Sequence, residues 1–197
     1  MMRIALTGSI GMGKSTVARM FEAEGIPLFD ADAVVRKLQG PGGPLVEPIG
    51  EHFSGTVKAG RLDRDKLAQI VLEDPAKLAE LEAIVHPAVR DARAVFIEAN
   101  RSAPALLFEI PLLFETGGDQ AFDKIVVVSA PPSVQRARVL ERPGMSEAKF
   151  RSLLSHQLPD EEKRHRADFV VDSGTDLSTT KAQVDAIIAC LGVAAGG

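Results

Sequence analysis

A glycine-rich loop near the start of the chain limits the possible fold more than any other stretch. Residues 3–7 form a short apolar run, residues 8–16 read GSIGMGKST, and residues 17–21 continue with helical character. Together they match the phosphate-binding pattern G-x-x-x-x-G-K-[ST] between a strand and a helix, which is the context that the pattern requires. Its glycines let the backbone curl so that N–H groups point at phosphate oxygens, and the following helix adds its positive end. The stretch predicts a site for a nucleoside triphosphate, although a plain glycine-rich turn is an alternative.

The fixed positions of this pattern are Gly8, Gly13, Lys14 and Ser15. The ammonium group of Lys14 can reach the β- and γ-phosphates, and the hydroxyl of Ser15 can bind Mg²⁺. A nucleoside triphosphate with Mg²⁺ is therefore the expected ligand, and the loop alone does not distinguish ATP from GTP.

The composition is that of an ordinary globular protein of one domain. The chain has 197 residues, of which 45% are hydrophobic and 25% charged. The net charge of −4 argues against a general nucleic-acid binder, which usually carries a basic face. The single cysteine, Cys190, cannot form an internal disulfide, so a reducing compartment is expected. We interpret it as a small apolar side chain on a C-terminal helix.

The sequence predicts a cytoplasmic protein without membrane contact. No stretch approaches the roughly 20 apolar residues that a spanning helix needs. The strand before the loop begins almost at once, which leaves no room for a signal peptide. We expect small-molecule substrates and favour a monomer.

Four further runs have the length of short or buried strands. They are residues 26–29, 105–110, 124–129 and 168–172, and helical stretches separate them. Continuous apolar runs are typical of parallel strands that are covered on both faces. With the strand before the loop, they predict an α/β fold: a P-loop NTPase-type five-stranded parallel sheet flanked by helices.

The predicted helices include two long stretches without strands. Residues 14–24 form a helix that Gly25 ends in a left-handed cap. Residues 45–100 are mostly helical, and Pro75 and Pro87 should each lie in the first turn of a helix. The polar stretch 146–166 is also predicted to be helical, and a last helix should close the chain.

Two insertions interrupt the predicted sheet domain. The Gly/Pro-rich break after residue 39 opens a helical insertion over about 40–102. A second Pro-Gly break opens a shorter insertion over about 143–166. The core would then comprise residues 1–39, 103–142 and 167–197.

Acidic residues follow two of the predicted strands. Ligands of open parallel sheets bind beyond the carboxyl ends of the strands, so Asp30, Asp32 and Glu109 should share an edge with the glycine-rich loop. A carboxylate beside a γ-phosphate can accept the proton of an attacking hydroxyl, and Asp32 is the candidate. Asp30 could instead cap the next helix, and Asp32 could pair with Arg36. Glu109 is a candidate second ligand of Mg²⁺, although acidic residues are common at strand ends.

Three arginines lie on or just after the helix that precedes the second insertion. Arg138 and Arg142 are four residues apart and should face the same way, whereas Arg136 should point elsewhere. An arginine at a lid hinge can clamp a transferring phosphoryl group, and solvated arginines on a helix surface are the alternative. His86 has no histidine or cysteine at metal-binding spacing, so we interpret it as a helix-start or acceptor-pocket residue.

Several stretches, in this order, resemble the dephospho-coenzyme A kinase family. They are LTGSIGMGKST at 6–16, DAD at 30–32 with Arg36, HP at 86–87, PLLFE at 111–115 and ADFVVD at 167–172. The resemblance spans nearly the whole chain. It implies a P-loop kinase core with a helical acceptor-binding insertion and a lid. It also implies transfer of the γ-phosphoryl group of ATP to the ribose 3′-hydroxyl of dephospho-CoA, the last step of coenzyme A synthesis.

The resemblance assigns roles residue by residue. Asp32 matches the base for the 3′-hydroxyl, Arg142 matches a lid arginine that acts on the nucleotide together with Lys14, and Gln157 matches a lid glutamine of unstated task. The implied ATP-binding residues are Gly8, Gly11, Met12, Gly13, Lys14, Ser15, Thr16 and Arg142, and the implied acceptor residues are Asp32, Arg36, His86, Pro111, Leu112 and Leu113, with Glu115 at the end of that stretch. Pro143 and Ser173 depart from the usual Asp and Asn, which leaves the lid and adenine contacts open.

Two other functions fit the glycine-rich loop. A kinase for another small acceptor, such as a nucleotide or a sugar acid, would share it, because the helical insertion decides the acceptor. A nucleotide-dependent switch would also share it but would need no base at Asp32. A GTP switch usually carries an N-K-x-D motif, which is not found after the strand at 124–129.

Overall fold

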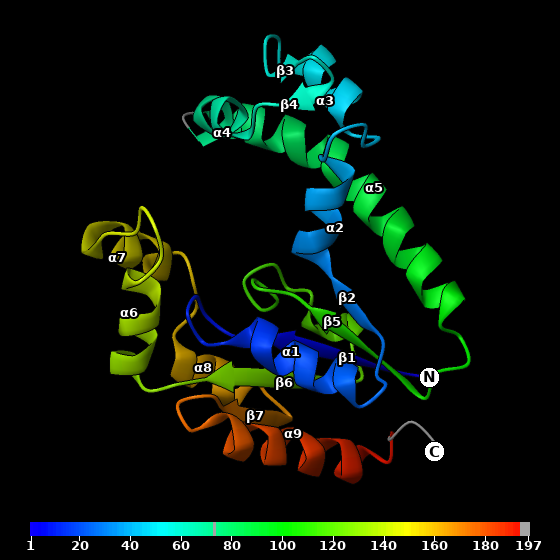
Figure 1. The fold of residues 1–197 in the computed structure, drawn as a ribbon, viewed down its shortest axis with the longest axis vertical. Coiled ribbons are helices and arrows are strands. Elements are labelled where there is room, and N and C mark those ends of the chain that lie inside the picture. Colours follow the sequence, from blue (N-terminus) through cyan, green and yellow to red (C-terminus); the bar gives the residue numbers. More distant parts are fainter. Residues whose placement is uncertain (73, 194–197) are drawn as a thin grey trace. The chain divides into compact units, whose positions relative to one another are not determined.

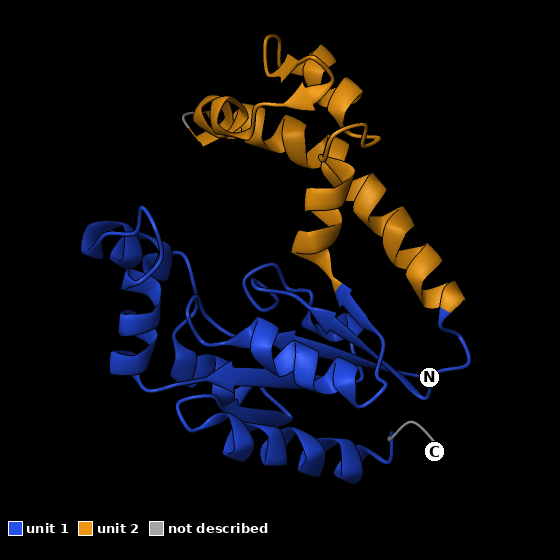
Figure 2. Cartoon of the chain, in the orientation of Figure 1, with its two compact units in different colours: residues 1–29, 100–197 blue, residues 30–99 orange. Residues whose placement is uncertain are grey.

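The computed structural model describes residues 1–72 and 74–193. The chain divides into two compact units (Figure 2). The first comprises Met1–Phe29 and Asn100–Gly197, and the second comprises Asp30–Ala99.

A five-stranded sheet forms the centre of the first unit, in the order β2-β5-β1-β6-β7 (Figure 1). β1 pairs in parallel with β5 and β6, and β6 pairs in parallel with β7. The strands are β1 Met2–Thr7, β2 Leu28–Asp30, β5 Ala105–Glu109, β6 Lys124–Ser129 and β7 Phe169–Asp172. The predicted five-stranded parallel sheet is confirmed, with the strand before the glycine-rich loop in the middle.

Helices connect these strands. Their bounds are α1 Lys14–Ala23, α6 Pro132–Leu140, α7 Glu147–Ser155, α8 Asp160–His165 and α9 Leu177–Leu191, with a short 3₁₀ helix η1 at Asp119–Ala121. Gly25 follows α1 with φ 81°, as predicted. The predicted helix over 146–166 is interrupted between α7 and α8. Pro159 is the extended residue just before α8, and a proline disfavours helical geometry at the residue that precedes it. Cys190 lies on α9 as predicted, but its side chain is exposed.

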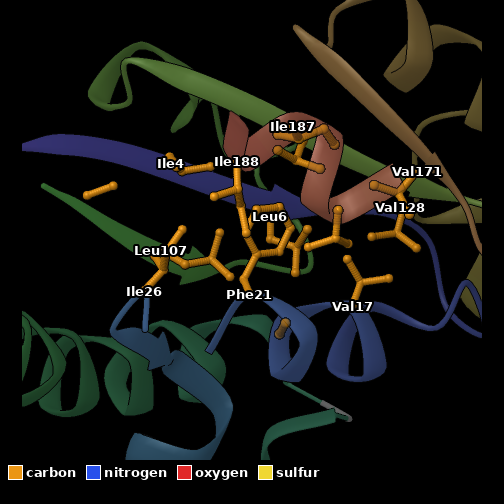
Figure 3. Packing of buried hydrophobic residues seen from close by; sticks show 14 of the residues in the cluster. Ile4, Leu6, Val17, Phe21, Ile26, Leu107, Val128, Val171, Ile187 and Ile188 are labelled. Atoms are coloured by element: carbon orange, nitrogen blue, oxygen red, sulfur yellow. The ribbon is translucent and has the colours of Figure 1, made fainter. Parts of the chain in front are cut away.

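The central strands β1, β5 and β6 bury most of both faces. Ile4 and Leu6 of β1 point to one side, where α1 and α9 pack against each other. Figure 3 shows Phe21 of α1 and Ile187 of α9 in this cluster. Ala5 points to the other side and joins a cluster with the segment after β5, where α8 also lies against β6. This alternation explains the continuous apolar runs in the sequence, because each face meets a covering layer.

The second unit is built around its own small core. It contains α2 Ala31–Leu38, α3 Val46–His52, α4 Arg64–Leu72 and α5 Pro75–Ala99, and a two-stranded antiparallel hairpin of β3 Val57–Lys58 and β4 Arg61–Leu62. Its buried cluster consists of Leu45, Ile49, Phe53, Leu67 and Val71. α2 packs against α5 in this unit.

The sequence did not predict the hairpin. Each of its strands is two residues long, too short for an alternating pattern to show. Its turn places Ala59 and Gly60 at φ 49° and 71°, the conformation of a tight hairpin turn.

Pro75 opens α5 as predicted, but the prediction that Pro87 opens another helix is wrong. Pro87 lies inside α5, which continues to Ala99. Proline removes one helical hydrogen bond, yet Leu81 and Val85 before it and Ala88 after it all pack on the unit's buried cluster. Because residues on both sides of Pro87 pack on the same cluster, α5 continues through the proline as a single helix. Within the described residues, every helix is too short or too polar to cross a membrane.

Candidate active site

The glycine-rich loop connects β1 to α1 and needs its glycines for two physical reasons. At Gly8 a Cβ atom would lie 2.3 Å from the carbonyl oxygen of Val128. Gly13 has φ 82°, in the left-handed region that side chains disfavour. The loop thus packs directly on β6 and leads into the start of α1.

Lys14 lies over the beginning of the loop. Its ammonium nitrogen donates to the carbonyl oxygen of Gly8 at 2.7 Å and to that of Ser9 at 3.3 Å. Thr16 lies in the first turn of α1, and its side chain is exposed. Met12 has a side chain buried in the core, so its backbone is the part that a nucleotide can contact.

Ser15 and Glu109, the two predicted ligands of Mg²⁺, are in contact. The Ser15 hydroxyl donates a hydrogen bond of 3.0 Å to Oε1 of Glu109 at the end of β5. Hydroxyl and carboxylate oxygens suit Mg²⁺, which proteins usually hold with one or two side chains plus substrate phosphates and water. The described residues include no cluster of three or more ligating side chains that would hold a metal alone. These two residues therefore fit a Mg²⁺ that arrives with a nucleotide.

Side chains from distant parts of the chain hold the loop's backbone. Gln157 accepts a hydrogen bond from the Ile10 N–H at 3.1 Å, and Gln135 donates to the Ile10 carbonyl at 2.8 Å. Ser173 donates to the Met12 carbonyl at 2.7 Å. Hydrogen bonds from distant side chains thus hold the loop at the backbone of Ile10 and at the backbone of Met12.

The arginines on and just after α6 separate as their spacing predicts. Arg136 pairs with Glu147 on α7 at 2.7 Å. Arg138 and Arg142 instead line one pocket of about 200 Å³ beside the glycine-rich loop, with Ser173 and Thr175. Arg138 donates to the hydroxyl of Ser173 at 3.0 Å and to the Ser173 carbonyl at 2.7 Å. The guanidinium group of Arg138 therefore stabilises the fold around Ser173. In the described part of the chain the Arg142 side chain has no such partner, which leaves it available to a ligand.

The acidic residues around α2 have different surroundings. Asp30 caps the helix through a 2.8 Å hydrogen bond from the N–H of Ala33, and it also lies 3.6 Å from the guanidinium group of Arg36. The capping alternative for Asp30 is therefore confirmed. Asp32 is exposed in the first turn of α2, and among the described residues of its unit it makes no ion pair with Arg36. His86 is exposed in the middle of α5, so its helix-start interpretation is wrong.

The stretch after β5 divides into exposed and buried residues. Leu112 is 41% exposed, whereas Leu113 is fully buried against the sheet. Pro111 is half-buried, and its carbonyl accepts from the hydroxyl of Thr7 at 3.4 Å. Pro111, Leu112 and Leu113 are the predicted acceptor residues in this stretch. The Leu113 side chain belongs to the buried cluster of this unit, so only its backbone could contact a ligand.

Glu115 forms a buried ion pair with Lys163 of α8. The Lys163 nitrogen lies 2.7 Å from Oε1 of Glu115, and the same oxygen accepts from the Leu158 N–H at 2.9 Å. Lys163 is completely buried. Burial raises the pKa of Glu115, but the hydrogen bonds from Lys163 and Leu158 outweigh it, so the net shift is below the ordinary value. Nearby, Arg166 pairs with Asp119 at 2.8 Å.

Spacing patterns did not indicate several of the residues that build the site. Gln135, Ser173 and Lys163 belong to no spacing pattern, because neutral or single polar side chains carry no periodic signal. Gln157 and Ser173 could be singled out only through the resemblance to a known family. Glu109 could be predicted for a different reason, namely its position at the end of a strand.

Comparison with known proteins agrees with this geometry. A family model described as dephospho-CoA kinase matches residues 2–179. A dephospho-CoA kinase of Mesorhizobium japonicum is 51% identical over 191 residues, which cover 95% of each chain. A crystal structure from Thermus thermophilus has a TM-score of 0.82 at 38% identity, covering 99% of this chain and 98% of that one. A dephospho-CoA kinase structure from Campylobacter jejuni has a TM-score of 0.67 at 22% identity, over 96% of both chains, and it supports the fold.

The match of the family model extends over the glycine-rich loop, both compact units and the last strand. The relative from Mesorhizobium japonicum is similar over 95% of this chain. The chain therefore belongs to the dephospho-CoA kinase family.

Proposed function

We propose that this chain transfers the γ-phosphoryl group of ATP to the ribose 3′-hydroxyl of dephospho-CoA. The products are coenzyme A and ADP, and the reaction is the final step of coenzyme A biosynthesis. The observation that carries the proposal is the contact of Ser15 with Glu109 beside Lys14, in a chain that belongs to this family. It places a cation, a hydroxyl and a carboxylate around the start of one helix, as phosphoryl transfer from a nucleotide requires.

The loop binds the phosphates of ATP. Backbone N–H groups from Gly11 to Thr16, at the positive end of α1, donate to phosphate oxygens. Lys14 leaves the carbonyls of Gly8 and Ser9 and offsets the charge that develops on the transferring group. Arg142 adds a second cation from the pocket that it lines with Gly11 and Gly13. The same pocket, which Thr175 also lines, takes the nucleoside.

Ser15, with Glu109, would hold Mg²⁺ on the nucleotide. Bound there, Mg²⁺ would supply charge neutralisation for the transferring phosphate. Glu109 is 7% exposed at the end of β5, so its carboxylate has a fixed position. The two oxygens come from rigid elements, which keeps the reactive phosphate oriented.

Asp32 acts on the acceptor. Its carboxylate takes the proton of the ribose 3′-hydroxyl while that oxygen forms a bond to the γ-phosphorus and the bond to the β,γ-bridging oxygen breaks. ADP leaves with the electron pair of that bond. The exposed Asp32 side chain is free to meet the hydroxyl, and Arg36, His86, Pro111, Leu112 and the Leu113 backbone bind the rest of dephospho-CoA.

The domain organisation serves the same reaction. Residues 40–102 form the acceptor-binding insertion of a single kinase domain, residues 143–166 form the lid, and the remaining residues form the core. Within that lid, α8 is fastened by Lys163 and by a 2.6 Å hydrogen bond from Ser129 to Asp160. The part that closes is therefore the stretch from residue 143 to the end of α7. Closure excludes water, the competing acceptor.

The enzyme acts in the cytoplasm as a monomer on small molecules, without nucleic acid or membrane partners. The net charge of −4 supports the lack of a nucleic-acid partner. A sedimentation measurement at working concentration tests the monomer, since a dimer would sediment faster.

A coupled ADP-release assay tests the reaction. It contains ATP, Mg²⁺ and dephospho-CoA, beside acceptor-free, nucleotide and sugar-acid controls. We expect ADP release that depends on dephospho-CoA, with coenzyme A identified by mass. Transfer only to another acceptor would retain the phosphate site and discard the proposed substrate. No transfer to any acceptor, with ATP still bound, would favour a nucleotide-dependent switch.

A further inference from the structure

Both backbone groups of Ile10 are held by glutamine side chains. The N–H of Ile10 donates to Oε1 of Gln157 at 3.1 Å, and its carbonyl accepts from Nε2 of Gln135 at 2.8 Å. The two glutamines are 147 and 125 residues away along the chain. Ile10 is the third residue of the glycine-rich loop, just before the stretch that binds phosphates.

The two hydrogen bonds have opposite polarity. Gln157 must present its amide oxygen and Gln135 its amide nitrogen, because each bonds a different backbone group. Gln135 is only 5% exposed, so this contact is protected from competing water. Fixing the N–H and the carbonyl of one residue constrains the peptide planes on both sides of Ile10.

The residue after Gln157 is anchored as well. The N–H of Leu158 donates to Glu115 at 2.9 Å, and the buried Lys163 holds the same carboxylate oxygen. The segment 157–158 therefore reaches the glycine-rich loop on one side and the stretch after β5 on the other. Gln157 is not at the end of a freely moving lid.

We propose that Gln157 and Gln135 are positioning residues that clamp Ile10 and keep the phosphate loop in its binding shape before ATP arrives. Neither glutamine needs to touch the nucleotide. When only a fraction of molecules has the competent loop, the apparent dissociation constant for ATP rises by the inverse of that fraction. The clamp should therefore affect KM for ATP more than KM for dephospho-CoA.

Methionine variants test the clamp, because methionine keeps the volume of glutamine without its amide. We expect Gln157→Met and Gln135→Met each to raise KM for ATP by about three- to tenfold, the effect of one lost hydrogen bond. KM for dephospho-CoA should change by less than about twofold. In the double variant, the fold-increase in KM for ATP should be smaller than the product of the two single increases, since both glutamines hold the same residue.

Amide hydrogen exchange at Ile10, followed by NMR, measures the contact without catalysis. Gln157→Met should speed exchange of the Ile10 amide, whereas Gln157→Glu should keep it slow, because a carboxylate still accepts from N–H. The control is His156→Ala, which disturbs the adjacent exposed residue and its contact to Ser152 but not Ile10. It should leave both exchange and KM for ATP unchanged.

The inference rests on the proposed role of this loop in binding ATP. If no coenzyme A is formed by the wild type, the proposed reaction fails, yet Ile10 exchange and the affinity for ATP still test the clamp. Unchanged Ile10 exchange in Gln157→Met, or an unchanged KM for ATP in both methionine variants, would overturn it. Should Gln157→Met not fold, Gln135→Met and Gln157→Glu still decide the outcome.

Discussion

The hydroxyl of Ser15 donates a 3.0 Å hydrogen bond to the carboxylate of Glu109, although 94 residues separate them. The sheet explains the contact. β1 and β5 pair in parallel with Leu6 opposite Glu109, so the end of β5 lies beside the start of the glycine-rich loop. The pairing of the strands therefore brings together a loop hydroxyl and a strand-end carboxylate that lie far apart in the sequence.

Glu109→Gln should weaken the use of Mg²⁺. The amide oxygen still accepts from Ser15, so the fold of the loop is kept while the negative charge is removed. We expect the Mg²⁺ concentration for half-maximal activity to rise about 10- to 100-fold. A titration of activity with Mg²⁺ measures this, and the wild type treated with a chelator gives the baseline. An unchanged midpoint would remove Glu109 from the metal site.

Lys14→Met should lower kcat by about 10²–10³-fold, because it removes one preorganised charge from the transferring phosphate. The Lys14 ammonium donates to the Gly8 and Ser9 carbonyls of its own loop at 2.7 and 3.3 Å, so we expect the thermal midpoint to change less than kcat does. Steady-state kinetics and a thermal melt of the same preparation separate the two effects. Near-normal turnover would contradict the assignment of Lys14.

Asp32→Asn should lower kcat by about 10²–10⁴-fold and leave KM for ATP unchanged, since general base catalysis acts on the acceptor hydroxyl. The adjacent change Asp30→Asn is the matched control. Asparagine caps helices about as well as aspartate, so α2 should stay intact. Equal losses of kcat in the two variants would contradict the assignment of Asp32 as the base, because Asp30→Asn keeps both α2 and the Asp32 carboxylate.

Arg142→Ala and Arg138→Ala should separate catalysis from structure. Arg142 lines the pocket without a side-chain partner in the described residues, so its loss should lower kcat/KM at least tenfold without changing stability. Arg138 holds the hydroxyl and the carbonyl of Ser173, so its loss should lower the free energy of unfolding by about 1–3 kcal/mol. Urea unfolding and steady-state kinetics on both variants decide between the two roles.

Glu115→Gln should destabilise the protein by about 3 kcal/mol at neutral pH, because Lys163 would be left buried without its charge partner. Combining it with Lys163→Met should recover part of the loss.

The effect should depend on pH. Because the pKa of Glu115 is lowered by folding, its contribution is present above the unfolded value of 4.5 and is lost as the pH falls through the lower folded value. The difference in unfolding free energy between wild type and Glu115→Gln should therefore shrink below pH 4.5. Urea unfolding at neutral and acidic pH measures it, and a constant difference would contradict the ion-pair argument.

The sequence alone was sufficient to predict the parallel sheet and the position of the glycine-rich loop. Strands such as 124–129 were found to the residue, because a strand covered on both faces must be continuously apolar. The loop was found because backbone curvature and phosphate chemistry restrict its residues to glycine, lysine and serine. Pro87 and the short hairpin at 57–62 were missed, because packing carries α5 past its proline and two-residue strands leave no period.

The sequence by itself thus determined the parallel sheet, the phosphate loop and the family, since each depends on local pattern or on short motifs. Only the tertiary structure decided which distant side chains meet the loop: Glu109 at Ser15, Gln157 and Gln135 at Ile10, and Ser173 at Met12. The physical reason is that a hydrogen bond depends on the positions of two atoms in space. A single polar residue far along the chain carries no local mark of the partner that folding brings to it.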